Sequence, residues 1–178
     1  MNAKFFIKKF ETLADAHTAV IAPEGLHRFY IQGSGGRVGA SWMTKEDRLT
    51  DIADNMHYLE RCLEHAGAKS DTPIIALGFS QGFHTLVRWA VQSRFHIGRI
   101  TAWGSHFPDD VLTPENLPFF QNTATDVVWG NADEYITKEK MRVHLQDLKN
   151  YGFSPHFEEY QGTHKIYPEI LQKLYVNE

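Results

Sequence analysis

Apolar and polar positions along this chain switch repeatedly between a strand-like pattern and a helical one. Short apolar runs predict strands at residues 18–22, 74–77, 97–103, 125–130 and 156–160. Apolar residues recurring every three or four positions predict helices at residues 3–14, 47–66, 137–150 and 167–175, and a further helix from Gln81. Because strands and helices alternate with mostly short connections, the pattern predicts an α/β fold: one domain, residues 1–178, with a mainly parallel sheet flanked by helices.

Two connections differ from the others in composition. Residues 24–50 are rich in glycine and aromatic residues and show no clear period, which predicts a long connection without regular structure that serves a site. The residues Thr113-Pro114-Glu115 resemble a helix start, with threonine as the cap and proline in the first turn.

The apolar run at 74–77 ends in the pentapeptide Gly78-Phe79-Ser80-Gln81-Gly82, and the helical pattern follows it directly. This is the context of a nucleophile elbow, in which a serine is held on a sharp strand-to-helix turn. Side chains at either glycine would collide with neighbouring backbone in so tight a turn. Ser80 is therefore the candidate nucleophile, and the backbone N–H of Gln81 is the candidate donor to an oxyanion.

A serine nucleophile needs a base, and that base needs an acid to orient it. Functional groups in a parallel sheet gather where the strands end, so the acid is expected just beyond a strand that follows Ser80. Asp133 follows the 125–130 strand directly and fits this position. Asp126 lies at the wrong end of the same strand, Glu134 is one position off, and residues 109–110 are expected in a solvated turn.

Most of the histidines in this chain lie on predicted helices or in connections that do not follow a strand. His164 follows the last predicted strand and precedes the closing helix, so it satisfies both the chain order and the strand-end position of a general base. His106 also follows a strand, and we expect it to line the substrate pocket together with Trp42 and Phe79. Core packing is an equally good interpretation of Trp42 and Phe79.

Composition narrows the choice of partners and location. The 178 residues carry a formal charge of −4, which does not favour nucleic acid or anionic membranes as main partners. The single cysteine, Cys62, cannot form an internal disulfide, and no apolar run reaches the roughly 20 residues of a membrane span. We therefore expect a cytoplasmic protein without membrane insertion. Whether it forms a homodimer stays open.

Three motifs together resemble the α/β-hydrolase superfamily, and within it the phospholipase/carboxylesterase (acyl-protein thioesterase-like) family. They are Gly78–Gly82, Gly130-Asn131-Ala132-Asp133 and Gly162-Thr163-His164. The resemblance extends over nearly the whole chain. It implies a serine hydrolase that cleaves small carboxylic esters or thioesters with Ser80, Asp133 and His164 as its triad, without a cofactor or metal. Lactones and peptides are alternative substrates.

The chain departs from this family near its beginning. The family has a strand ending in a His-Gly motif that supplies the second oxyanion N–H, and residues 1–178 contain no counterpart. The chain is expected to be an N-terminally reduced α/β hydrolase, through a truncated or misassigned start or as a reduced variant. Loss of one oxyanion donor lowers turnover by roughly 10²–10³-fold. The alternative function is therefore a catalytically weak or inactive hydrolase-fold binding protein.

Overall fold

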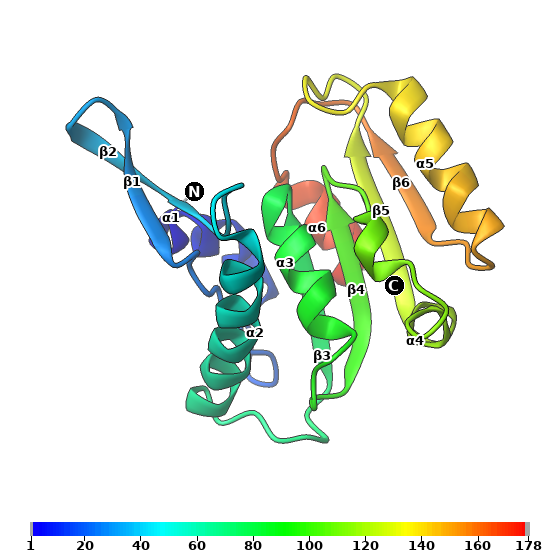
Figure 1. The fold of residues 1–178 in the computed structure, drawn as a ribbon, viewed down its shortest axis with the longest axis horizontal. Coiled ribbons are helices and arrows are strands. Elements are labelled where there is room, and N and C mark those ends of the chain that lie inside the picture. The colour runs from blue at the N-terminus through cyan, green and yellow to red at the C-terminus, as the bar shows by residue number, and fades with distance from the viewer. Residues whose placement is uncertain (1, 177–178) are drawn as a thin grey trace. The chain divides into compact units, whose positions relative to one another are not determined.

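The computed structural model describes residues 2–176, which divide into two compact units (Figure 1). Residues 69–165 form the first, which we call the sheet unit. The described residues before and after this range form the second, which we call the terminal unit. The single domain predicted from the sequence stays a prediction.

The sheet unit is built on four parallel strands (Figure 1). These strands are β3 (Ile74–Phe79), β4 (Ile97–Trp103), β5 (Ala124–Gly130) and β6 (His156–Tyr160), and they lie side by side in that order. Because all of them run the same way, their carboxyl ends meet at one edge of the sheet. The predicted parallel sheet is confirmed.

Helices follow each of the first three strands. They are α3 (Gln81–Ala90), α4 (Leu117–Asn122) and α5 (Lys138–Asn150), with a short 3-10 turn, η2 (Asp109–Val111), before α4. Helix α3 packs on β3 and β4, and α4 contacts β5. The helix start predicted at Thr113 is wrong. The Thr113 carbonyl accepts the N–H groups of Asn116 and Leu117, so residues 113–116 form a turn and α4 begins at Leu117.

The core of the sheet unit lies around its two inner strands. Six of their apolar residues are at most 1% exposed: Ile100, Ala102, Trp103, Val127, Val128 and Trp129. Phe107 packs edge-on against Phe83 of α3 and Phe120 of α4 and joins the helices to this core. Burying each large apolar side chain contributes about 1.5–3 kcal/mol, so the inner strands form the rigid part of the unit.

The terminal unit combines short helices with a two-stranded antiparallel sheet. Its elements are α1 (Ala3–Phe6), the 3-10 helix η1 (Ile7–Leu13), β1 (His27–Gln32), β2 (Gly35–Ser41), α2 (Arg48–His65) and α6 (Pro168–Tyr175). Helix α6 packs against η1, where Phe10 is buried. Among residues 2–176, no helix combines the length and the apolar character that a membrane span requires.

Two predictions for the terminal unit are wrong. Residues 18–22 are irregular: Asp15 accepts the backbone N–H groups of His17 and Thr18 and so stabilises a turn before them. An apolar run becomes a strand only if a neighbour pairs with it. Residues 24–50 are not irregular throughout, because β1 and β2 pair as a hairpin there. Gly33, with φ of 57°, allows the turn between them.

The amino-terminal end of β5 holds a buried charge cluster. Asp126, whose side chain is 2% exposed, accepts two hydrogen bonds from Arg99, at 2.7 and 2.9 Å, and one from the Thr101 hydroxyl at 2.8 Å. His156 lies 3.2 Å away on β6. Asp126 therefore joins three neighbouring strands at the edge opposite to Asp133, and its role is structural.

The substitution Asp126→Asn removes the negative charge that compensates Arg99 inside the sheet. Breaking such a buried pair costs roughly 3 kcal/mol, so we expect a clearly lower urea midpoint. Glu139→Gln is the control, because it breaks a two-bond Arg142–Glu139 pair whose side chains are 68% and 70% exposed. Equal midpoints for the two variants would contradict a structural role of Asp126.

Candidate active site

Ser80 lies between β3 and α3 in a strained conformation. Its φ of 53° and ψ of −128° are in a region that residues with side chains rarely adopt. Its N–H donates to the Trp103 carbonyl on β4 at 2.9 Å, and its carbonyl accepts the Phe83 N–H at 3.0 Å. The turn is therefore held from both the neighbouring strand and the following helix.

Gly78 shows why the turn needs glycine before the serine. A Cβ atom built on Gly78 would lie 2.2 Å from the Cα of Phe83 and 2.6 Å from its backbone nitrogen. Helix α3 thus crosses the end of β3 so closely that no side chain fits between them. This steric role of Gly78, predicted from the sequence, is confirmed.

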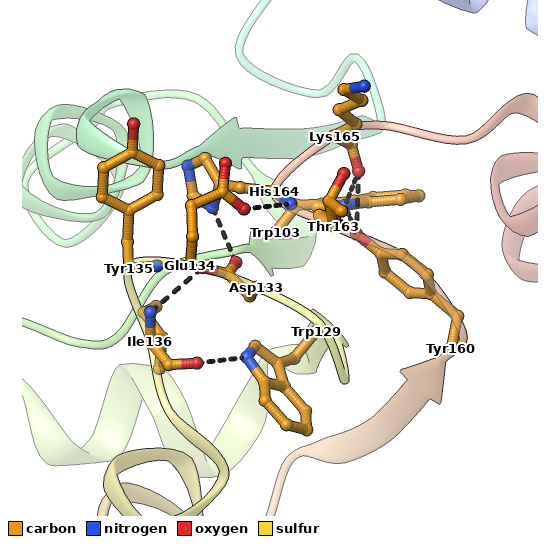
Figure 2. A network of polar contacts seen from close by, with 10 residues as sticks. All are labelled: Trp103, Trp129, Asp133, Glu134, Tyr135, Ile136, Tyr160, Thr163, His164 and Lys165. Carbon is orange, nitrogen blue, oxygen red and sulfur yellow. Dashed lines mark hydrogen bonds and ion pairs between the residues drawn. The ribbon is translucent and has the colours of Figure 1, made fainter.

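Asp133 and His164 are brought together at the carboxyl ends of β5 and β6. Asp133 Oδ2 lies 2.6 Å from His164 Nδ1, and the two side chains are 0% and 10% exposed. Asp133 Oδ1 accepts the backbone N–H groups of Tyr135 at 2.8 Å and Ile136 at 3.0 Å. Both carboxylate oxygens are engaged, so the carboxylate has a fixed orientation and in turn fixes one nitrogen of the imidazole (Figure 2).

The loop that carries His164 is held by the side chains of Trp103 and Tyr160 (Figure 2). The Trp103 indole N–H points at the Tyr160 hydroxyl, 3.1 Å away, and at the Lys165 carbonyl, 3.0 Å away. The Tyr160 hydroxyl donates to the same carbonyl at 2.8 Å. From the other side, Glu134 accepts the His164 backbone N–H at 3.3 Å. Glu134, the carboxylate next to the candidate acid, thus contacts the backbone of the histidine.

Gly104 lies directly against the imidazole. Its φ is +54°, and a Cβ atom built on it would be 2.9 Å from Cε1 and 3.0 Å from Nδ1 of His164. Its N–H donates to the Val128 carbonyl at 2.8 Å. The residue before it, Trp103, accepts the Ser80 N–H, so one short segment at the end of β4 borders both the serine turn and the histidine.

Among residues 2–176, two aromatic rings contact His164. The rings of Phe79 and Tyr135 each have their centroid 4.7 Å from that of the imidazole. Phe79 was predicted to line the pocket, whereas Tyr135 was missed. The only signal for it in the sequence is an aromatic residue two positions after the candidate acid. Gln81, the predicted oxyanion donor, is the first residue of α3.

The other predicted pocket residues have different surroundings. Trp42 belongs to the terminal unit, where its ring lies 6.4 Å from that of Tyr58 and its carbonyl accepts the buried Asn55 amide at 2.7 Å. His106 is exposed just beyond β4 and contacts His84 and His144, with ring centroids 4.9 and 5.8 Å away.

Burial affects the ionisation of two of these histidines. It lowers the pKa of His84 and of His144 to about 4, and the charge of His106 contributes in the same direction. The Phe107 N–H donates to His144 Nε2 at 3.1 Å, which favours the neutral ring. Among residues 2–176, no group of three or more His, Cys, Asp or Glu residues is arranged to hold a metal ion, and this includes the three histidines.

Comparison with known proteins shows which fold this is. No model of a protein family matches the chain, and no curated protein sequence matches it. Among solved structures, the chain is similar to acyl-protein thioesterase 2 of Zea mays, with a TM-score of 0.59 and 17% identity over 78% of this chain and 71% of that one. It is also similar to an α/β serine hydrolase homologue of Coxiella burnetii, with a TM-score of 0.52 and 18% identity over 84% and 65% of the two chains.

An uncharacterized protein of Bacillus cereus matches 97% of this chain with a TM-score of 0.68 and 18% identity. The chain spans 54% of the length of that protein. The chain has the α/β-hydrolase fold. At these identities the likeness concerns the fold, and the resemblance predicted from the sequence motifs is confirmed at that level. In this fold the serine turn, Asp133 and His164 all lie at the carboxyl edge of the sheet.

The low pKa values of His84 and His144 predict how stability depends on pH. Each ring binds a proton near pH 6.5 when unfolded but only near pH 4 when folded, so stability is full above pH 6.5 and falls as the pH drops toward 4. His84→Gln removes one of these groups and should flatten the dependence of the urea midpoint on pH in that window. His57→Gln, at an exposed position on α2, should keep the wild-type slope, and an equal slope in both variants would contradict the assignment.

Proposed function

We propose that this chain is a serine hydrolase that cleaves carboxylic esters or thioesters, with Ser80 as nucleophile, His164 as general base and Asp133 as the residue that orients the base. The observation that carries this proposal is the 2.6 Å contact between Asp133 and His164, together with a strained serine turn that is held by the same end of β4 that borders the imidazole. Acyl transfer requires a serine on a tight turn, an imidazole in a fixed orientation and a carboxylate that orients the imidazole.

In the first half of the reaction, His164 removes the Ser80 hydroxyl proton as the oxygen attacks the substrate carbonyl. The carbonyl oxygen becomes an oxyanion, and the Gln81 N–H at the start of α3 donates to it. Asp133 stabilises the imidazolium and holds its tautomer. The intermediate collapses when the bond to the leaving oxygen or sulfur breaks and the His164 proton passes to that atom. An alcohol or thiol departs, and Ser80 carries the acyl group.

In the second half, His164 takes a proton from water as the water oxygen attacks the acyl-Ser80 carbonyl. The ester bond to Ser80 then breaks, the proton returns to the serine oxygen and the carboxylic acid leaves. The thioester alternative is supported by the likeness to a maize acyl-protein thioesterase, and both substrate classes follow the same steps. Phe79 offers an apolar surface beside the imidazole, which favours an apolar acyl or alcohol part.

A fluorophosphonate probe tests the nucleophile. We expect intact-protein mass spectrometry to show one adduct on the wild type and none on Ser80→Ala, together with loss of p-nitrophenyl acetate hydrolysis in that variant. Ser70→Ala is the matched control at an exposed serine of the same unit and should behave as the wild type does. Absence of an adduct on the wild type would instead favour a hydrolase-fold binding protein.

The role of Asp133 is tested by Asp133→Asn. The amide keeps the size of the side chain but presents an N–H group to Nδ1 of His164, which favours the wrong imidazole tautomer. By analogy with the serine proteases, we expect kcat to fall by about 10⁴-fold. Asp147→Asn, on the exposed side of α5, is the control and should retain activity. A loss below tenfold in Asp133→Asn would argue against its role as the orienting acid.

A further inference from the structure

Of the two rings that contact His164, Tyr135 is the accessible one. Tyr135 is 68% exposed, whereas Phe79 is half-buried and the imidazole of His164 is 10% exposed. The Tyr135 and His164 rings meet nearly edge to face, at 62°. A molecule that approaches His164 from solvent therefore meets a large aromatic surface at the edge of the imidazole.

The position of Tyr135 is tied to the candidate acid. Its backbone N–H donates to Asp133 Oδ1 at 2.8 Å, and the next N–H, that of Ile136, donates to the same oxygen at 3.0 Å. Trp129 donates its indole N–H to the Ile136 carbonyl at 3.0 Å. The backbone on both sides of Tyr135 is thus held by buried groups, so the phenol projects from a fixed base although its ring is exposed.

The direction of the ring matters for the reaction. Figure 2 shows Asp133 on one side of the His164 imidazole, with the Tyr135 ring beside the imidazole and the phenol hydroxyl directed away from Asp133. Asp133 occupies Nδ1, so the nitrogen that exchanges protons with the substrate is Nε2. The leaving atom must come within about 3 Å of this nitrogen to receive its proton. Whatever is attached to the leaving atom then lies within reach of the Tyr135 ring.

We propose that Tyr135 forms an aromatic subsite for the leaving group and selects esters and thioesters whose alcohol or thiol part carries an aromatic or flat apolar group. This inference rests on the proposed function. A well-placed pair of aromatic rings contributes enough to change selectivity by about 3- to 10-fold. The contact forms with the leaving group already in the bound substrate, so the effect falls mainly on KM.

Benzyl acetate and methyl acetate provide the test. The two esters share an acyl group, and both release an unhindered alcohol. The ratio of their kcat/KM values therefore reports on contacts made by the phenyl ring of the benzyl ester. We expect Tyr135→Ala to lower the benzyl-to-methyl ratio by about 3- to 10-fold through a higher KM for the benzyl ester, and Tyr135→Phe to restore the wild-type ratio. Tyr151→Ala removes a tyrosine that is 41% exposed after α5, and it should leave the ratio unchanged.

The outcomes separate this inference from the function on which it rests. An equal loss on both esters, carried by kcat, would mean that Tyr135 only supports His164, and it would overturn the subsite. An unchanged ratio in Tyr135→Ala would do the same while leaving the hydrolase function standing. A wild-type protein that labels with a fluorophosphonate at Ser80 but cleaves neither ester would also overturn the subsite. A wild type that neither labels nor cleaves would overturn the function and the subsite together.

Discussion

Trp103 and Gly104, at the end of β4, connect all parts of the candidate site. The Trp103 carbonyl holds the Ser80 turn, its indole N–H holds the loop that carries His164, and the missing side chain of Gly104 makes room for the imidazole. Trp103 is fully buried between the neighbouring strands, so this segment cannot shift without disturbing the core. The geometry of two distant stretches of sequence, around Ser80 and around His164, thus depends on these two residues at the end of an inner strand.

Sequence patterns predicted the part of this arrangement that follows from local chemistry. Gly78 before Ser80 marks a tight turn because no side chain fits there, and the parallel strands place Asp133 and His164 at the same end of the sheet as that turn. Chain order then left one aspartate and one histidine at suitable strand ends. The fold was therefore predictable from the sequence, and so was the position of these three residues at one end of the sheet, while their catalytic roles stay a prediction.

Contacts between distant residues were not accessible in the same way. In the sequence, Trp103 looks like an ordinary core residue. Its hydrogen bonds to Tyr160 and Lys165 depend on the conformation of the loop after β6 that carries His164. Tyr135 reads as a surface residue until the turn around Asp133 is known. The same reason explains the errors at residues 18–22 and 24–50, since pairing with a neighbour decides whether a segment becomes a strand.

The backbone of Ser80 has a consequence for how this position can change. Glycine adopts a φ of 53° with a ψ of −128° far more easily than serine does, and strain of this kind costs about 1–3 kcal/mol. Selection for folding alone would therefore favour glycine at residue 80. Under the proposed function, chemistry and folding stability therefore make opposite demands on residue 80, and a lineage that no longer needed the chemistry would gain a more stable fold by giving up the hydroxyl.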